Sequence, residues 1–251
     1  MGWDADGLEA RVEGHYTYQY DNGVYAEMLT AEKPNDLHTV NAAKWGIDRD
    51  PSKAIKYACT YGAQGAKLAR MLGVADSQGA VFREQFWSDC WPLAYFKAEV
   101  RNEWKSNGKK LIQGPDDRFL ATRSEHSILN LKFQHTGALI MKLAMCYVFD
   151  QVTKEGLDAQ ALIRYHDEEQ WQQARSEIKF KRFETEAEAK EYKVEGRILS
   201  KEFERDGYWW KAYSRVGELG VLSIVWAGQY LKLKVPLSAE YMVGESWGDC
   251  H

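Results

Sequence analysis

Helical periodicity is clearest between Arg49 and Gly62, where the sequence reads RDPSKAIKYACTYG. Apolar residues recur there with the spacing of one helical face. They are Ala54, Ile55, Ala58 and Cys59. Asp50 can cap the helix, and Pro51 suits its first position because the N–H that proline lacks would be unpaired there. Gly62 can adopt the left-handed conformation that ends many helices. We therefore expect one helix over these residues.

A second stripe of the same helix is cationic and aromatic. Its members recur every four residues and so lie along one face. They are Arg49, Lys53, Tyr57 and Tyr61. The two cations stand near the helix N-terminus, where backbone N–H groups already favour anions. Such a face suits a nucleotide, with phosphates at one end and a ring at the other. A surface helix with a basic edge would show the same spacing, so periodicity alone leaves both interpretations open.

Elsewhere the hydrophobic pattern changes between helical and strand periods, so both kinds of element are expected. Helices are expected over residues 81–105 (interrupted at Trp91-Pro92), 125–155 and 216–231, whereas residues 8–18 are expected to be helical or irregular. Short strands are expected beside the turn at 114–117, over 161–172 around an acidic turn, and at 232–236. Apolar residues on one face of the 125–155 helix predict core positions. They are Leu129, Phe133, Ile140 and Ala144.

Three neutral polar residues form a stripe on this long helix, namely His126, Asn130 and Gln134. Their four-residue spacing places them on one face. Side chains of this kind suit hydrogen bonding to base edges in a nucleic-acid groove. A solvated helix face is the alternative, and the spacing does not separate the two.

Composition limits how the chain could bind nucleic acid. The 251 residues carry a formal net charge of -4, so any such binding must be local or assisted by a partner. The four cysteines are scattered, without the spacing of a metal site or a disulfide framework, as expected in a reducing cytoplasm. No apolar run is long enough for a membrane span, so no membrane partner is expected.

Carboxylates are concentrated in two short segments. Asp4, Asp6 and Glu9 lie near the N-terminus, and the sequence His166-Asp167-Glu168 forms the expected acidic turn between apolar flanks. Clustered carboxylate oxygens can bind a hard cation, and an acidic turn between strands is typical of a site. A solvated acidic terminus would explain the first cluster equally well. The charge-dense stretch Arg175–Asp206 is expected to be a surface insertion or a small β-rich subdomain, and no chemistry is assigned to it.

Three of these segments, in their order along the chain, resemble the motifs of family A DNA polymerases, particularly the phage replicative enzymes. DADGLEAR resembles motif A, RDPSKAIKYACTYG resembles motif B, the fingers helix, and YHDEEQW resembles motif C. The segment RSEHSILNLKFQHTGALIMKL is similar to the family helix that faces the primer–template, and VGESWGDCH is similar to the family's ending. One motif alone would be a weak signal, but three in order are specific. The resemblance covers nearly the whole chain except roughly residues 175–214.

The resemblance implies an α+β fold, with an antiparallel palm sheet and a helical fingers subdomain. It places palm at 1–30 with motif A, fingers at 31–113 with the motif B helix at 49–62, and palm again at 114–251. The last part includes the polar DNA-facing helix, motif C and an insertion at about 175–214. No thumb or exonuclease is expected in these residues. The implied activity is template-directed DNA synthesis, in which a dNTP transfers its nucleotidyl group to a primer 3′-hydroxyl.

By the same resemblance, two Mg²⁺ ions are the implied cofactors. The carboxylates of Asp4 and Asp167 and the backbone carbonyl of Ala5 would hold them, since hard oxygen ligands suit this ion. Glu168 would support the metal site or the primer end. Lys53 completes the implied catalytic residues.

The implied nucleotide site involves five side chains. Arg49 and Lys53 would bind the incoming phosphates, with His38 helping. Tyr57 would stack under the base or sugar. Glu9 together with Tyr57 would close off the 2′ position against ribonucleotides.

The implied DNA contacts lie in two other parts of the chain. Tyr61 and Gly62 would border the templating base, and Asn130 and Gln134 would read minor-groove acceptors, which all correct base pairs share. The remaining implied DNA-binding residues are His126 and, at the primer terminus, His166.

The resemblance also implies a partner. Complete family members carry a thumb, the first palm strands and often an exonuclease before motif A. We therefore expect the C-terminal half of a split polymerase in the cytoplasm of a phage-infected bacterium. An N-terminal fragment would supply the thumb, the rest of the palm and any exonuclease. The strand that carries Asp4 is expected to be short and to leave sheet edges unpaired.

Two alternatives stay open. One is a polymerase relic that binds primer–template or its partner without catalysis. The other is a fragment similar to single-subunit RNA polymerases, although Glu9 at the sugar position favours deoxynucleotides. A metal-dependent hydrolase is disfavoured because it would leave the phosphate-binding helix unexplained.

Overall fold

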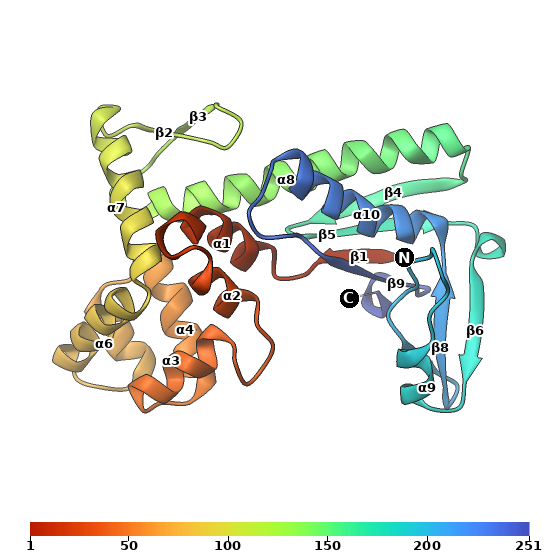
Figure 1. Ribbon diagram of the computed structural model, residues 1–251, viewed down its shortest axis with the longest axis horizontal. Helices are drawn as coiled ribbons and strands as arrows, with labels where there is room; N and C mark the ends of the chain where they lie inside the picture. Colours follow the sequence, from red (N-terminus) through yellow and green to blue (C-terminus); the bar gives the residue numbers. More distant parts are fainter. Residues whose placement is uncertain (251) are drawn as a thin grey trace. The chain divides into compact units, whose positions relative to one another are not determined.

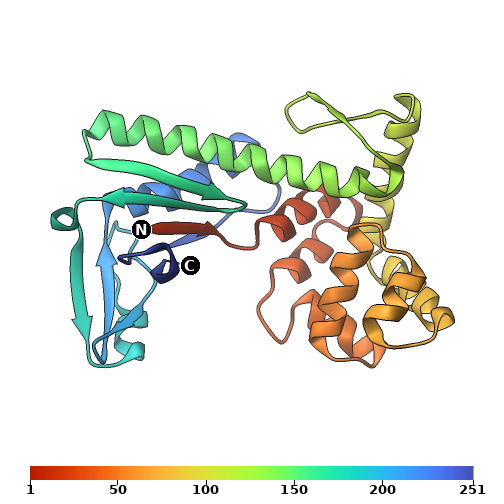
Figure 2. The ribbon, with the colours of Figure 1, turned by 180° about the vertical axis from the view of Figure 1, so that it is seen from behind.

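The computed structural model describes residues 1–250, shown in Figure 1 and from behind in Figure 2. The chain divides into two compact units. The sheet unit comprises Met1–Leu8 and Gly137–His251, and the helical unit comprises Glu9–Thr136. The expected borders after residues 30 and 113 both fall inside the helical unit, so the division into palm and fingers stays a prediction. No helix within residues 1–250 is long and apolar enough to cross a membrane.

The sheet unit is built on a four-stranded antiparallel sheet with the order β4-β5-β1-β9. Its strands are β1 (Gly2–Ala5), β4 (Ala159–Tyr165), β5 (Glu168–Gln173) and β9 (Ala239–Met242). Successive side chains of a strand point to opposite faces. Trp3 therefore enters the core, where it stacks on Trp171 at 5.6 Å, and Asp4 faces the opposite side. The acidic turn expected between two strands is confirmed at β4 and β5.

The strand that carries Asp4 is short, as expected, and it is central in the sheet, because β1 pairs with β5 on one side and with β9 on the other. The unpaired edges of this sheet are those of β4 and β9. One other sequence expectation for this part of the chain is wrong. Residues 232–236 form no strand. Instead Lys232 adopts a positive φ of 54° and the Leu233 N–H donates to the Gly228 carbonyl, which closes the end of the preceding helix.

That helix, α10 (Arg215–Tyr230), covers the Trp3 side of the sheet and needs glycine to approach it. A Cβ atom added to Gly220 would lie 2.3 Å from the Trp3 ring, and one added to Gly217 would lie 2.4 Å from the Tyr241 ring. The long helix α8 (Ile128–Glu155) contacts both the sheet and α10. Its Phe149 ring lies 5.0 Å from that of Trp171.

The core positions expected on α8 are all buried: Leu129, Phe133, Ile140 and Ala144. The regular helix begins at Ile128, because residues 125–127 form a 3₁₀ turn before it. The predicted helix from residue 125 is therefore correct in place and extent, apart from its first turn.

The expected insertion forms a small β-rich subdomain. Its three strands pair antiparallel in the order β6-β8-β7. The elements are β6 (Lys179–Phe183), α9 (Glu186–Glu191), β7 (Phe203–Arg205) and β8 (Tyr208–Tyr213). Helix α9 starts with a capping box, in which the Thr185 hydroxyl accepts from the Glu188 N–H and the Glu188 carboxylate accepts from the Thr185 N–H.

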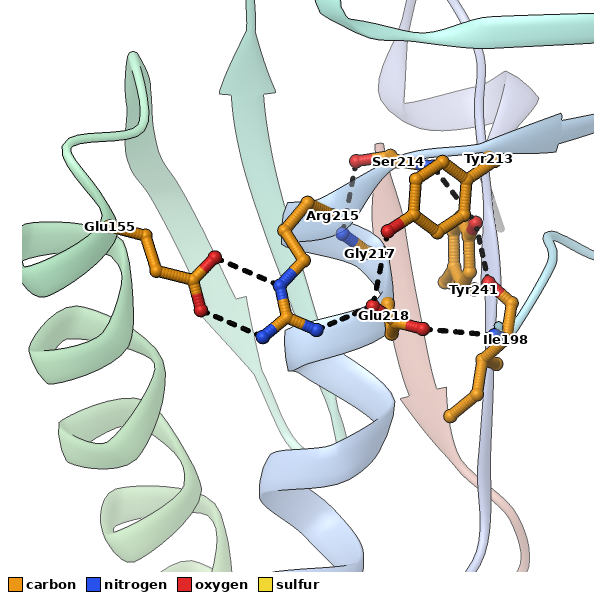
Figure 3. Close-up of polar contacts among 8 residues, drawn as sticks. All are labelled: Glu155, Ile198, Tyr213, Ser214, Arg215, Gly217, Glu218 and Tyr241. Carbon is orange, nitrogen blue, oxygen red and sulfur yellow. Dashed lines mark hydrogen bonds and ion pairs between the residues drawn. The ribbon is translucent and has the colours of Figure 1, made fainter. Parts of the chain in front are cut away.

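An ion-pair network fixes the end of the insertion to α8 and α10 (Figure 3). Arg215 donates two hydrogen bonds to the Glu155 carboxylate, at 2.9 and 2.7 Å, and pairs with Glu218 at 2.5 Å. The second oxygen of Glu218 accepts from the Ile198 N–H at 3.1 Å. The Ser214 hydroxyl caps α10 by accepting from the Gly217 N–H at 3.1 Å. The insertion is thus anchored at both its middle and its end.

Within residues 9–136 the helical unit contains the helices α1 to α7, a short hairpin, the 3₁₀ turn at 125–127 and the start of α8. The helices are α1 (Leu8–Asp21), α2 (Val24–Thr30), α3 (Leu37–Trp45), α4 (Arg49–Thr60), α5 (Gly65–Leu72), α6 (Asp76–Asp89) and α7 (Trp91–Ser106). The hairpin pairs β2 (Leu111–Gln113) with β3 (Phe119–Ala121), as expected from the turn at 114–117. The interruption expected at Trp91-Pro92 is confirmed, because α6 ends at Asp89 and α7 begins at Trp91.

A buried ion pair lies in the core of the helical unit, and the sequence pattern did not predict it. Lys56 of α4 is 2% exposed, and its ammonium lies 2.8 Å from the carboxylate of Glu13, whose side chain is 0% exposed. Tyr25 donates to the other Glu13 oxygen at 2.7 Å. Burial alone lowers the pKa of Lys56, but the charge and hydrogen bond of Glu13 raise it above its ordinary value. Lys56 is therefore charged in the core and depends on Glu13.

Replacing Glu13 by Gln should destabilise the protein by about 3–5 kcal/mol, because Lys56 would stay buried without its counter-charge. Urea unfolding measures this change. Glu32→Gln, at an exposed position, is the control and should change stability by less than about 0.5 kcal/mol. The double variant Glu13→Gln/Lys56→Met should regain part of the loss. Equal stability of Glu13→Gln and the wild type would contradict the role of this pair.

Replacing Gly220 by Ala should destabilise the sheet unit by about 1–3 kcal/mol, because the new methyl group would overlap the Trp3 ring. Gly137→Ala is the matched control in α8, since its Cβ would lie 3.5 Å from its nearest neighbour, Leu8. This control should stabilise by about 0.5–1 kcal/mol, because alanine is the better helix former. Thermal unfolding of both variants tests the pair, and a neutral Gly220→Ala would refute the packing argument.

Candidate active site

Three carboxylates lie in a row across one face of the sheet. Asp4 on β1 stands directly opposite Glu168 on β5 and Glu240 on β9. Residues opposite each other in an antiparallel pair share a face, and like charges in such positions are unfavourable. This face of the sheet therefore concentrates negative charge.

The turn between β4 and β5 adds a further carboxylate, that of Asp167. His166 makes the turn tight by adopting a positive φ of 53°. The Ala5 N–H donates to the Asp167 carbonyl at 3.0 Å, which ties the end of β1 to this turn. Partial burial of its carboxylate, and then the charges of Asp167 and Glu168, raise the pKa of Asp4 to about 6. The structure thus brings together the predicted residues Asp4, Ala5, His166, Asp167 and Glu168.

Glu168 differs from its neighbours in being buried, at 4% exposure. The indole N–H of Trp247 donates to it at 2.7 Å, and the Gln170 side-chain amide donates to the same oxygen. The sequence resemblance did not single out Trp247 or Glu240. The position of Glu240 opposite Asp4 follows from the pairing of β1 with β9, and the sequence did not predict β9.

The donor set fits a divalent cation of the hard type. Within residues 1–250, no group of three or more His, Cys, Asp or Glu side chains is arranged as a complete metal site. Asp4 and Asp167 nevertheless offer two carboxylates where negative charge is already crowded. Mg²⁺ keeps several waters and takes substrate phosphates as further ligands, so one or two carboxylates suffice.

In the helical unit, α4 begins earlier than the sequence suggested. Its N-cap is Asp48, whose carbonyl accepts from the Ser52 N–H, and Arg49 is the first helical residue. The prediction that Asp50 caps the helix is therefore wrong. Pro51 is tolerated as the third residue because the N–H groups of the whole first turn lack helical partners. At the other end Gly62 adopts the expected left-handed conformation, with φ 86°.

Arg49 is held by a carboxylate that the motif comparison did not include. Its guanidinium donates to Asp36 through Nε at 3.2 Å and through Nη2 at 3.0 Å. Asp36 also caps α3 by accepting from the His38 N–H at 3.1 Å, and accepts from the Thr39 hydroxyl at 2.6 Å. Burial raises the pKa of Asp36, but the hydrogen bonds from Thr39 and Arg49 outweigh it and lower the pKa to about 2. In the sequence, Asp36 stands at the N-cap position before Leu37, and this pattern was the signal that could have pointed to Asp36.

His38 lies beside the aromatic stripe of α4. Its ring centroid is 6.1 Å from that of Tyr57. Burial, and then the charges of Lys56 and Arg49, lower the pKa of His38 to about 4, so the ring is neutral at pH 7. The ring atom Nδ1 is buried without a hydrogen-bond partner. His38 can therefore offer a hydrogen bond but not a charge.

The stripe predicted on α4 is continuous. Lys53 is exposed, and the rings of Tyr57 and Tyr61 stack at 6.3 Å. The Tyr61 hydroxyl donates to Glu9 at 2.8 Å. Glu9 was expected beside Tyr57, and the structure gives it Tyr61 as its direct hydrogen-bond partner.

The predicted stripe of His126, Asn130 and Gln134 is not continuous on one helix, because His126 lies before α8. His126 lies in the 3₁₀ turn and packs against Gly62, where an added Cβ would be 2.9 Å from the His126 carbonyl oxygen. Asn130 is half-buried with its side-chain oxygen unpaired, and Gln134 is exposed. Gly62 and His126 are thus neighbours, which the sequence spacing did not show.

Comparison with known proteins supports one family. The model of the family described as DNA polymerase family A matches residues 8–195. The DNA-directed DNA polymerase of Enterobacteria phage T3 is 25% identical over 270 residues, covering 100% of this chain and 33% of the relative. That of Escherichia phage Phieco32 is 24% identical over 281 residues, covering 100% of this chain and 40% of the relative. The chain thus spans two fifths or less of these relatives.

A solved structure shares the fold. It is the POL domain of Pol1 from M. smegmatis in complex with DNA primer-template and dNTP, with a TM-score of 0.67 and 19% identity. The match covers 95% of this chain and 38% of that one. Together with the motifs in the candidate site, the family match over more than half of the sequence establishes the assignment. The chain belongs to DNA polymerase family A.

Proposed function

We propose that the chain carries out template-directed DNA synthesis, transferring nucleotidyl groups from dNTPs to a primer 3′-hydroxyl. The observation that carries this proposal is the proximity of Asp4 and Asp167. Asp4 lies opposite Glu168, the residue after Asp167, and the Ala5 N–H donates to the Asp167 carbonyl. Two carboxylates from distant parts of the sequence stand side by side in a field of further negative charge. Such a site needs cations to function.

Asp4, Asp167 and the Ala5 carbonyl would hold two Mg²⁺ ions. When bound, the ions supply positive charge to the triphosphate and lower the pKa of the primer hydroxyl. The buried Glu168, fixed by Trp247, would keep the shape of the turn beside the primer end. His166, at the tip of the turn, would contact the primer terminus.

The helical unit would bind the nucleotide. Arg49, held in place by Asp36, and the exposed Lys53 would contact the phosphates, and pre-placed cations stabilise the charge that develops on the leaving pyrophosphate. The neutral His38 would donate a hydrogen bond to a phosphate oxygen. Tyr57 would stack under the base or sugar.

The sugar and the template would meet residues of the same unit. Glu9, hydrogen-bonded to Tyr61 next to the Tyr57 ring, would leave no space for a ribose 2′-hydroxyl. Gly62 would border the templating base. The remaining proposed DNA contacts are His126, Asn130 and Gln134, the last two to minor-groove acceptors.

Synthesis would also need polymerase parts that correspond to the unmatched regions of the phage relatives. The phage relatives are far longer than the stretch they share with this chain. A polypeptide with the thumb, the rest of the palm and any exonuclease is the proposed partner. Primer extension with Mg²⁺ and four dNTPs, with and without such an N-terminal fragment, tests this requirement. Full extension by this chain alone would overturn it.

Asp4→Asn and Asp167→Asn should each reduce primer extension by about 10³-fold or more, because the variants lose a charged ligand for the cations. Asp206→Asn, at an exposed turn with positive φ that Asn tolerates, is the control and should extend primers normally. All variants are assayed in the complex that supports extension. Undiminished extension by Asp4→Asn would contradict the proposed mechanism.

Glu9→Ala should raise the incorporation of ribonucleotides relative to deoxynucleotides by about 10–200-fold, because the carboxylate no longer blocks the 2′ position. Tyr61→Phe, which removes only the hydrogen bond to Glu9, should show a smaller increase. Glu32→Ala is the exposed control. The ratio of kcat/KM values for the two nucleotides is the measurement. A wild-type preference for ribonucleotides would favour the RNA polymerase alternative instead.

A further inference from the structure

A cluster of three cations lies where α6 and α7 meet. Arg83 and Trp87 are four residues apart on α6, and Lys97 and Arg101 are four residues apart on α7, so each pair shares a helix face. The Lys97 ammonium lies 3.8 Å from the centre of the Trp87 ring, which shows that these two faces meet.

The cluster has more positive charge than its neighbours neutralise. Arg101 pairs with Glu125 at 2.5 Å. Arg83 donates only through Nε, to the Ala63 carbonyl at 3.3 Å. Within residues 1–250 the Lys97 ammonium makes no hydrogen bond or ion pair, and neither do the two terminal nitrogens of Arg83. One carboxylate therefore serves three cations.

Assembling this cluster costs stability. Burial of Lys97, and then the charge of Arg83, lower the pKa of Lys97 to about 8. Like charges four residues apart on a helix, as in Lys97 and Arg101, are also unfavourable. The indole N–H of Trp87 is buried without an acceptor. A solvated surface would avoid each of these costs, whereas an anion bound between the helices would relieve the charge repulsion.

The cluster continues the surface where the template is proposed to lie. Ala63, which accepts from Arg83, directly follows Gly62 at the end of α4. Glu125, which pairs with Arg101, directly precedes His126, and His126 packs against Gly62. Both contacts place the cations next to residues proposed to border the templating base.

We propose that Arg83, Lys97 and Arg101 form a binding site for the phosphates of a single-stranded DNA segment, the unpaired template. Cations spread over two helices suit successive phosphates of a strand better than one isolated phosphate. The choice of DNA rests on the proposed function, but the site itself does not need catalysis.

Binding of a fluorescein-labelled dT12 oligonucleotide to the full chain, measured by fluorescence anisotropy at low salt, tests the site. Lys97→Met and Arg83→Gln should each weaken binding by about tenfold. The slope of log affinity against log salt should fall by about 0.7 for each cation removed. Lys97→Arg, which keeps the charge, should bind normally. Lys105→Gln, an exposed cation further along α7, is the matched control and should change little.

Other arms of the experiment identify the ligand. Millimolar inorganic phosphate should not displace dT12, and primer–templates with a long 5′ template overhang should bind more tightly than those with a one-nucleotide overhang. Asp4→Asn should bind dT12 as the wild type does, so a failure of primer extension would leave this result intact. The proposal is overturned if the wild type does not bind dT12, if Lys97→Met and Arg83→Gln bind equally well while circular dichroism shows them folded, or if phosphate displaces the strand.

Discussion

The pairing of β1 between β5 and β9 is the constraint on which the candidate active site depends. It sets Asp4 opposite Glu168 and Glu240, and the hydrogen bond from Ala5 to the Asp167 carbonyl brings the turn alongside. A slip of one residue would turn Asp4 into the core, because side chains alternate between the faces of a strand. The register is fixed by the opposite face, where Trp3 stacks on Trp171 beneath α10. The polar site and the apolar core are thus two faces of one strand.

Two cations of α4 are held in place by carboxylates. Lys56 points into the core and is neutralised by Glu13. Arg49, on the same helix, is oriented by Asp36, which also caps α3. A charged side chain that is hydrogen-bonded in place loses less entropy when a ligand arrives. Helix α4 therefore carries both a buried ion pair and a cation that a neighbouring carboxylate orients.

The β-rich subdomain, which the sequence analysis expected as an insertion, is attached to the sheet unit without disturbing the sheet. Its last strand leads directly into α10, and Arg215 joins the start of that helix to Glu155 and Glu218 (Figure 3). The Tyr241 hydroxyl, from β9, lies within hydrogen-bonding distance of the carbonyls of Ile198 and Ala212. The insertion is held by the same elements that support β1, so it extends the sheet unit rather than interrupting it.

The sequence by itself determined what depends on neighbours along the chain. Local spacing predicted the helix that begins at Arg49, the acidic turn at 166–168 and the core face of α8. For the charge-dense stretch it left a surface insertion and a β-rich subdomain both open. Motif order was enough to indicate the polymerase family, which the family match then confirmed. Local spacing failed at the strand expected at 232–236, where residues after the end of α10 form a turn and loop instead of a strand.

Only the tertiary structure decided which distant groups meet. The sequence pattern did not single out Lys56, because its partner Glu13 lies on another helix and nothing in the periodicity of α4 reveals it. Asp36 with Arg49, Trp247 with Glu168, and Lys97 beside Arg83 are of the same kind. Such pairs depend on how elements pack and on the cost of burying a charge. These energies arise between segments far apart in the sequence, and spacing along one segment does not encode them.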